Sequence, residues 1–320
     1  MRRYPISTLF LMLLGCCVGL AAEAPRSPDF NSDPFQKHWY DGKAELAGYE
    51  LTIPRYGQTR KGEAVTIFVY EPFSNSARVK ADPGKHPATD EFPVMKLNLV
   101  EDFATGVYDY NLMTSVFVAM SSVNNLPPGT PTKVSFSSQE WCGHVYEQML
   151  FDSSSIRRTR HSYFDGEGDV NDTLEFPKNG ISEDSLLFWA RGMAGPVLEP
   201  GQSIEVPMLT SVKVTRLNHV TAAWSNAKLS RAAETQKIKV AAGEFEVDVF
   251  SVSVDNDAKR SRTIYVEHAF PHRIIRWELG NGEKAELLGT ERMSYWKMNG
   301  PGFEEAVRKL GLNPRPGRTM

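Results

Sequence analysis

Residues 273–295, with the sequence RIIRWELGNGEKAELLGTERMSY, decide the fold. Two runs rich in Ile, Leu, Trp and Thr lie on either side of Gly280-Asn281-Gly282. A Gly-Asn-Gly segment between two such runs is a strong signal for a tight β-hairpin, because glycine and asparagine accept the backbone angles that the turn requires. The segment therefore predicts two antiparallel strands, over residues 273–279 and 283–295.

The same pattern of short β-rich runs separated by turn residues continues through most of the chain. Residues 65–70 (VTIFVY) are typical, since β-branched and aromatic side chains fit the pleated surface of a strand. Outside the hairpin, strands are predicted over residues 44–54, 63–71, 92–101, 108–120, 133–152, 203–209, 211–219, 236–240, 245–254 and 262–266.

Only two stretches have helical character. Residues 182–193 begin with Ser182 as a candidate N-cap and have acidic residues in the first turn. Residues 303–312 have apolar side chains at helical spacing, with Gly302 before them. Short strands in series without crossover helices predict a mainly β fold. We expect an antiparallel, strongly curved meander, as one open half-barrel-like sheet or two such sheets, with one or two short helices.

The first residues have the three parts of an export signal. Arg2 and Arg3 precede an apolar run at 6–14, and small residues follow it. The run is shorter than the roughly 20 residues of a membrane-spanning helix. Two processing routes remain open, because residues 13–16 (LLGC) resemble a lipobox that would acylate Cys16, whereas residues 20–22 (LAA) suit an ordinary signal peptidase. We expect an exported, periplasmic protein, held at the outer membrane as a lipoprotein if Cys16 is acylated.

The remaining sequence divides by composition. After a signal peptide of residues 1–22, or 1–15 in the lipoprotein, residues 23–34 form a proline-rich flexible linker. An N-terminal β region is predicted over 35–180, a C-terminal β half-barrel over 181–300, and a helix and tail over 301–320. The net charge of −3 offers nucleic acid no attraction.

Parts of the C-terminal half resemble a known family. Residues 240–247 (VAAGEFEV), 271–278 (PHRIIRWE) and 184–191 (DSLLFWAR) are similar to segments of the DUF3108 family of bacterial envelope proteins, within a match over about residues 180–297. This resemblance implies an open antiparallel half-barrel wrapped round a helix, akin to lipoprotein carriers that hold acyl chains in an apolar concavity.

Two segments of the first half resemble an uncharacterised lipoprotein family. They are residues 137–144 (SSQEWCGH) and 162–169 (SYFDGEGD). Some members of that family are labelled septum formation inhibitor Maf. The Ser-x-Ser-Pro-Arg-Arg loop that opens the Maf nucleotide pyrophosphatases does not occur in this sequence.

Cys142 and His144 are the candidate catalytic residues. On a strand, side chains two residues apart point to the same face and could form a thiolate–imidazolium pair or half of a metal site. The sequence supplies no orienting group or oxyanion hole for such a pair. A buried cysteine beside a hydrogen-bonded histidine is the favoured interpretation, because lone cysteines pack as small hydrophobic side chains.

Two further groups of residues could bind a metal. His161, Asp165, Glu167 and Asp169 resemble the start of a calcium loop, but Phe176 stands where an EF-hand needs a bidentate carboxylate. A solvated hairpin turn is favoured for them. The four-residue spacing of His268 and His272 would place both side chains on one face of a helix. The proline between them excludes that helix and favours a turn between strands.

Aromatic side chains are the candidate ligand-binding residues. The candidates are Trp141, Trp189 and Trp277. Such side chains would suit an apolar cavity or a surface that stacks on glycans, although packing in the core explains them equally well. The sequence contains no Walker loop, dinucleotide fingerprint, HExxH, GxSxG or paired CxxC motif, and no cofactor is predicted.

Three functions remain open at this point. The favoured one is an exported non-catalytic protein whose curved sheet binds a lipid or another apolar or amphipathic envelope molecule. The second is a thiol- or metal-dependent envelope hydrolase centred on Cys142 and His144. The third is a structural component of an envelope complex.

Overall fold

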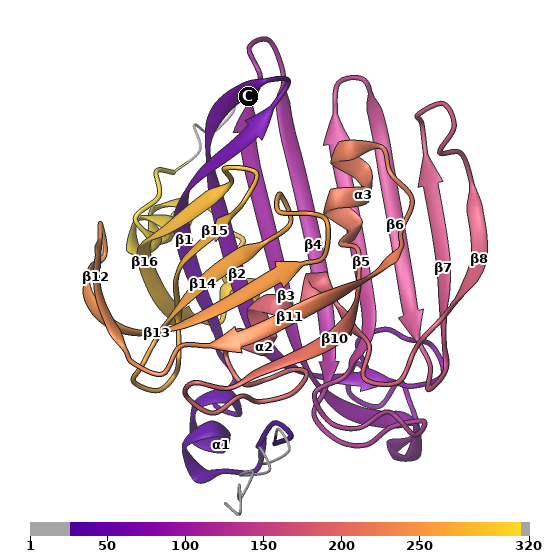
Figure 1. Cartoon of the computed structure of the whole chain (residues 1–320). Coiled ribbons are helices and arrows are strands. Elements are labelled where there is room, and N and C mark those ends of the chain that lie inside the picture. Colours follow the sequence, from indigo (N-terminus) through magenta and orange to yellow (C-terminus); the bar gives the residue numbers. More distant parts are fainter. Residues whose placement is uncertain (1–25, 315–320) are drawn as a thin grey trace, which may run out of the picture.

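The computed structural model describes residues 26–314 (Figure 1). The first half of the chain forms eight strands in sequence, each antiparallel to the next. They are β1 (Ala44–Arg55), β2 (Gln58–Ser74), β3 (Glu91–Ala104), β4 (Asp109–Ala119), β5 (Pro131–Glu140), β6 (Gly143–Phe151), β7 (Ser155–Ser162) and β8 (Val170–Glu175).

The second half adds eight strands and most of the helical segments. Its strands are β9 (Ile181–Ser182), β10 (Ser203–Leu209), β11 (Trp224–Arg231), β12 (Gln236–Val240), β13 (Gly243–Val254), β14 (Arg262–Glu267), β15 (Ile274–Leu279) and β16 (Lys284–Met293). The α-helices of the described chain are α1 (Asp33–Trp39), α2 (Leu186–Ala190) and α3 (Val212–Asn218). The 3-10 helices are η1 (Ala88–Asp90), η2 (Glu183–Ser185), η3 (Tyr295–Lys297) and η4 (Glu304–Leu310).

All sixteen strands belong to a single curved sheet. Its order is β8-β7-β6-β5-β4-β3-β2-β1-β16-β15-β14-β13-β11-β10-β9, with β12 added on β13. The pairing is antiparallel except between β9 and β10. The two halves join where β1 pairs with β16, so the mainly β, strongly curved meander predicted from the sequence is confirmed, as one sheet. The described chain has three short α-helices, whereas one or two short helices were expected.

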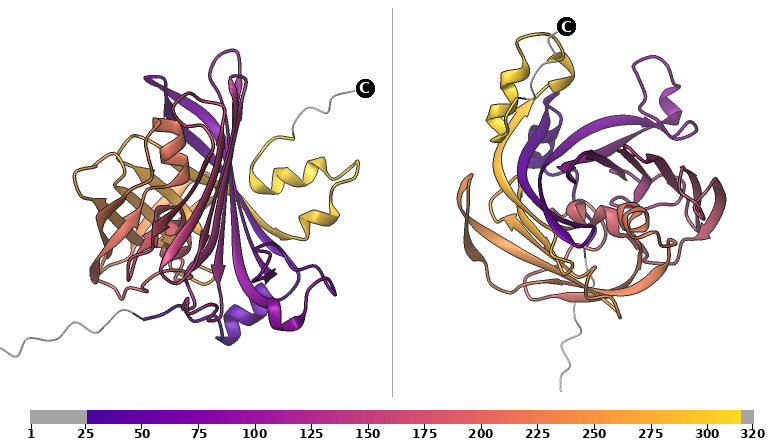
Figure 2. Two further views of the ribbon diagram at one scale, coloured as in Figure 1. Left: turned by 90° about the vertical axis from the view of Figure 1, so that its right-hand side faces the viewer. Right: turned by 90° about the horizontal axis from the view of Figure 1, so that it is seen from above.

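The sheet curls without closing. Its edge strands β8 and β9 are linked by residues 176–180, and Trp224 of β11 stacks on Phe176 with its Nε1 donating to the Glu175 carbonyl at 3.1 Å. Seen from above, α2 and α3 lie inside the curve (Figure 2). The side chains of α2 are fully buried there, where Phe188 packs on Phe68 of the first half and Trp189 on Phe250 of the second. The hydrophobic core therefore joins both halves.

The C-terminal segment covers the opposite, convex face of the sheet (Figure 2). Leu310 and Leu312 pack there on Leu46 and Val69. Gly48 of β1 and Gly289 of β16 lie opposite each other, and a Cβ atom at either position would come within 2.3 Å and 2.7 Å of backbone oxygens of the segment. The absence of side chains at this pair lets the segment lie directly on the sheet.

One predicted strand is wrong. Residues 211–219 form helix α3 instead, because Ser211 caps its N-terminus and Asp184 accepts from the Val212 amide at 3.2 Å. Its Val and Thr content favoured a strand locally, but tertiary capping and packing override such weak preferences. The predicted strand over 133–152 is the hairpin β5–β6.

The other boundaries follow the prediction in part. Gly280-Asn281-Gly282 forms the expected turn between β15 and β16. Helix α1 begins at Asp33, inside the predicted linker, and Phe30 before it is buried. The polar strands β7, β8 and β11 were not predicted. Within residues 26–314, no helix is both long and apolar enough to span a membrane.

Candidate functional site

Four exposed or half-exposed aromatic residues form a line along one end of the sheet, which we call the aromatic rim. Tyr56, Tyr108, Trp141 and Tyr163 lie at the turns that join β1–β2, β3–β4, β5–β6 and β7–β8, at the upper end of these strands (Figure 1). Trp141 is 75% exposed and Tyr163 is 71% exposed. Large aromatic side chains in water at several adjacent turns indicate an interaction surface.

Contacts between neighbouring turns hold the aromatic rim together. The Tyr108 hydroxyl donates to that of Tyr56 at 3.3 Å, and the rings of Tyr108 and Trp141 stack at 6.3 Å. Behind them the Arg55 guanidinium lies 4.4 Å from the centre of the Tyr56 ring. Gly143 makes room for Tyr163, since a Cβ atom at Gly143 would come within 2.4 Å of that ring.

A groove on the convex face begins next to the aromatic rim. Strand residues alternate between faces. On β4, Thr114 and Val116 point to the interior, so Met113, which directly precedes Thr114, points outward. The groove has a volume of about 530 Å³ and contains no Lys or Arg. Its lining residues are Val100, Asn111, Leu112, Met113, Ser137, Ser138, Gln139, His144, Val145, Tyr146, His161, Ser162, Tyr163 and Asp169. We call it the convex groove.

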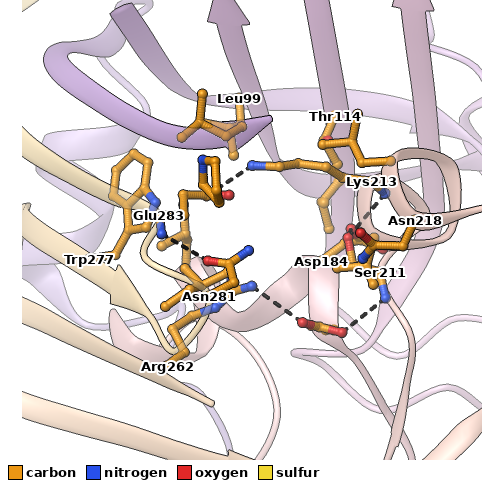
Figure 3. Close-up of a pocket in the computed structure, with 18 of the residues that line it drawn as sticks. Leu99, Thr114, Asp184, Ser211, Lys213, Asn218, Arg262, Trp277, Asn281 and Glu283 are labelled. Carbon is orange, nitrogen blue, oxygen red and sulfur yellow. Dashed lines mark hydrogen bonds and ion pairs between the residues drawn. The ribbon is translucent and has the colours of Figure 1, made fainter. Parts of the chain in front are cut away.

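A cavity on the concave side of the sheet is much smaller than the convex groove. It measures about 90 Å³, enough for a few water molecules, and lies between both halves and α3 (Figure 3). Lys213 and Glu283 point toward each other across it, with the Lys213 Nζ 2.9 Å from Glu283 Oε1. Its lining includes the charged side chains of Asp184, Lys213, Arg262 and Glu283, which does not suit an acyl chain.

Lys213 is the centre of a buried ionic network. Its ammonium also bonds Oε1 of Glu101 at 2.6 Å. Burial disfavours charge on Lys213, but Glu101 and Glu283 outweigh that effect and raise its pKa. Burial also raises the pKa of Glu101. An ammonium with a raised pKa stays protonated at neutral pH, so Lys213 is suited to holding β3, α3 and the β15–β16 turn together and not to nucleophilic chemistry.

A second set of buried carboxylates fixes η2 and the start of α3. Glu183 accepts from Arg260 Nε at 3.0 Å and from the Ser211 amide at 3.1 Å. Asp184 accepts from the Ser211 hydroxyl at 2.6 Å. Burial raises the pKa of Asp184 to about 6. Each carboxylate is bonded to main-chain or side-chain donors of neighbouring elements, which indicates a structural role for the network.

The predicted catalytic residues lie on different elements. Cys142 lies in the two-residue turn between β5 and β6 and His144 on β6, so the alternation expected for one strand does not apply. Cys142 is exposed, and a hydrogen bond to the Glu140 carboxylate raises the pKa of its thiol. That shift favours the thiol over the reactive thiolate. His144 is exposed and lines the convex groove.

The three predicted tryptophans lie in three different environments. Trp141 belongs to the aromatic rim. Trp189 is buried, and its Nε1 donates to the Pro196 carbonyl at 3.0 Å. Trp277 is buried against Tyr49 and borders the interior cavity. The predicted lipidation site, Cys16, lies outside the described residues.

Of the histidine and acidic candidates, His161 lies near the end of β7 and the others lie in turns. His161 and Asp169 form an ion pair at 3.0 Å near the β7–β8 turn, while Glu167 contacts His219 on the other side of that turn. His268 bonds Asp248 at 3.0 Å, and His272 lies beyond the intervening turn. Among residues 26–314, no group of three or more His, Cys, Asp and Glu side chains is placed to hold a metal ion.

Sequence reasoning missed Tyr56, Tyr108, Tyr146 and Tyr163. A usable signal was present, because Tyr56, Tyr108 and Tyr163 each stand beside a glycine-containing turn, where a large aromatic side chain has few packing partners. The turns that carry them are separated by two antiparallel strands each, so every one of these turns lies at the same end of the sheet. Comparisons with protein-family models, curated proteins and solved structures found no match, and the resemblance to the DUF3108 family stays a prediction.

Proposed function

We propose that this chain is an exported, non-catalytic binding protein that holds an amphipathic molecule of the cell envelope against the aromatic rim and the convex groove. The single observation that carries the proposal is the set of exposed and half-exposed rings at four adjacent turns, three of which contact one another. Side chains with a flat apolar body and a polar tip contribute large contact area at low entropic cost, which suits an amphipathic ligand.

The filled interior directs the proposal to the outer face. Helices α2 and α3 occupy the concave side, and the cavity between α3 and the sheet is about 90 Å³ with charged lining. The convex groove is several times larger and open to solvent. A ligand of the size of a lipid headgroup or a saccharide can reach the groove without any opening of the sheet.

The described chain begins at the opposite end of the strands from the aromatic rim. Pro28 packs there on Gly129 of the β4–β5 connection. Export itself rests on Arg2, Arg3 and the apolar run at residues 6–14.

Co-sedimentation with washed envelope fragments from the host cell tests the proposal. The double variant Trp141→Ala/Tyr163→Ala removes the two most exposed rings, and we expect its bound fraction to fall at least tenfold. The matched control, Tyr40→Ala/Trp296→Ala, removes rings that are 44% and 45% exposed elsewhere on the surface and should bind like the wild type. Equal binding by both variants, or no binding by the wild type, would contradict the proposal.

A further inference from the structure

Uncharged polar side chains form a continuous row across six strands of the convex face. Register pairing places them directly opposite one another, in the order Asn98, Ser115, Ser135, Gln148, Thr159 and Asn171 from β3 to β8. With strands about 4.8 Å apart, the row is about 24 Å long. Asn98 and Ser115 are buried and bonded to each other at 2.7 Å, so the accessible part of the row lies on β5 to β8. A stretch of amides and hydroxyls without a single charge is uncommon on a surface, where Lys, Glu, Arg and Asp predominate.

A second row, one step closer to the aromatic rim, contains the floor of the convex groove. It runs through Val100, Met113, Ser137, Tyr146 and His161 in the same register. Ser137 is the smallest member and lies between Met113 and Tyr146, so a hollow opens above it. Tyr146 is 42% exposed and donates its hydroxyl to Gln148 of the uncharged row at 3.2 Å, which fixes the ring at the edge of the hollow.

The third row supplies further amides. Asn111 and Gln139 lie opposite each other, followed by His144 on β6. The main formal charge in the lining, Asp169, is paired with His161. The convex groove thus combines neutral hydrogen-bonding groups with the rings of Tyr146 and Tyr163, and Trp141 lies just beyond it.

We infer that the convex groove binds an extended, neutral glycan chain of β-linked pyranose units. A pyranose ring has hydroxyl groups at its edge, which amides and hydroxyls recognise, and a C–H face that stacks on an aromatic ring. The groove has no Lys or Arg for a phosphate or another anion. Its apolar area is divided by polar rows, unlike a lipid site. A β-1,4-linked chain is an extended ribbon, which matches a row of side chains that crosses several strands.

This inference rests on the proposed function and names its ligand class. The experiment measures binding of two neutral hexasaccharides, cellohexaose and chitohexaose, to the purified protein by isothermal titration calorimetry. We expect at least one of them to bind and Tyr146→Ala to weaken its binding at least tenfold. Ser137→Arg, which fills the hollow and adds a charge, should abolish binding, and Trp296→Ala should leave it unchanged.

Envelope co-sedimentation in parallel separates the two proposals. One outcome is that the wild type binds envelope fragments and vesicles of phosphatidylethanolamine and phosphatidylglycerol but neither hexasaccharide. In that case the glycan inference is wrong and the proposed function stands. Undiminished hexasaccharide binding by Ser137→Arg would place the glycan outside the convex groove and overturn the inference. Competition of the hexasaccharide with envelope fragments for the wild type would support both proposals.

Discussion

Lys213 of α3 donates a hydrogen bond of 2.6 Å to Glu101 of β3, and Glu101 is completely buried. The same ammonium bonds Glu283, which follows the β15–β16 turn. One side chain therefore ties a helix of the second half to strands of both halves. The aromatic rim and convex groove depend on this arrangement only indirectly, since they lie on the other face of β3 to β8.

Replacement of Lys213 by Met is expected to destabilise the protein by about 3–5 kcal/mol, because two carboxylates remain buried without a cation. Urea denaturation followed by circular dichroism measures the change. The triple variant Lys213→Met/Glu101→Gln/Glu283→Gln removes those charges and should recover part of the loss. A cost below about 1 kcal/mol for the single variant would show that the network contributes little to stability.

Glu147 should make the protein less stable as the pH rises. Burial raises the pKa of this β6 side chain to about 7 from 4.5. Between these values the folded chain keeps a proton that the unfolded chain releases, so the contribution to stability is complete below about pH 4.5 and is lost as the pH rises through 7. Glu147→Gln should reduce the loss between pH 5 and pH 8 by about 2 kcal/mol. The control variant Glu244→Gln, at an exposed position, should show the same loss of stability as the wild type. If Glu147→Gln also lost as much stability as the wild type between these pH values, Glu147 would not be the group responsible.

Gly48→Ala should displace the C-terminal segment from the sheet. The new Cβ atom would come within 2.3 Å of the Leu310 carbonyl oxygen, so the segment must move away. We expect a cost of about 1–3 kcal/mol, as for other overpacked sites, and faster proteolysis within residues 296–312. Gly300→Ala has open space around its Cβ position and serves as the control. Unchanged proteolysis of Gly48→Ala would argue against direct packing.

Gly143→Ala tests the position of Tyr163. A methyl group at residue 143 would overlap the Tyr163 ring, which must leave its place beside the convex groove. Envelope binding should fall as far as in Tyr163→Ala, while the melting temperature changes by only a few degrees because both residues lie at a surface turn. Binding at the wild-type level would mean that Tyr163 does not contact the ligand.

Local signals in the sequence predicted the strands and turns well. Gly280-Asn281-Gly282 predicted its hairpin because glycine and asparagine readily adopt the backbone angles that the turn requires. Helix α3 was missed because its Val and Thr content favours a strand, and the Asp184 carboxylate that accepts from its first amide lies 28 residues earlier in the chain. The strand β7 was missed because its sequence, SIRRTRHS, is mostly polar.

The candidate site was less accessible to sequence reasoning than the fold. The convex groove depends on the register that puts Tyr146 opposite both Ser137 and His161, and a shift of one residue would turn each of these side chains to the other face. Lys213, Glu101 and Glu283 are likewise separated by 112 and 70 positions. Pairings over such distances cannot be predicted from a single sequence without knowledge of the strand order.

The most direct test of the account is the accessibility of Trp141 when the protein binds. In a Trp296→Phe background, Trp141 is the most exposed tryptophan of the described chain, so iodide quenching of fluorescence reports mainly on the aromatic rim. Washed envelope fragments are expected to reduce that quenching severalfold. Unchanged quenching of protein that has sedimented with the fragments would contradict binding through the aromatic rim.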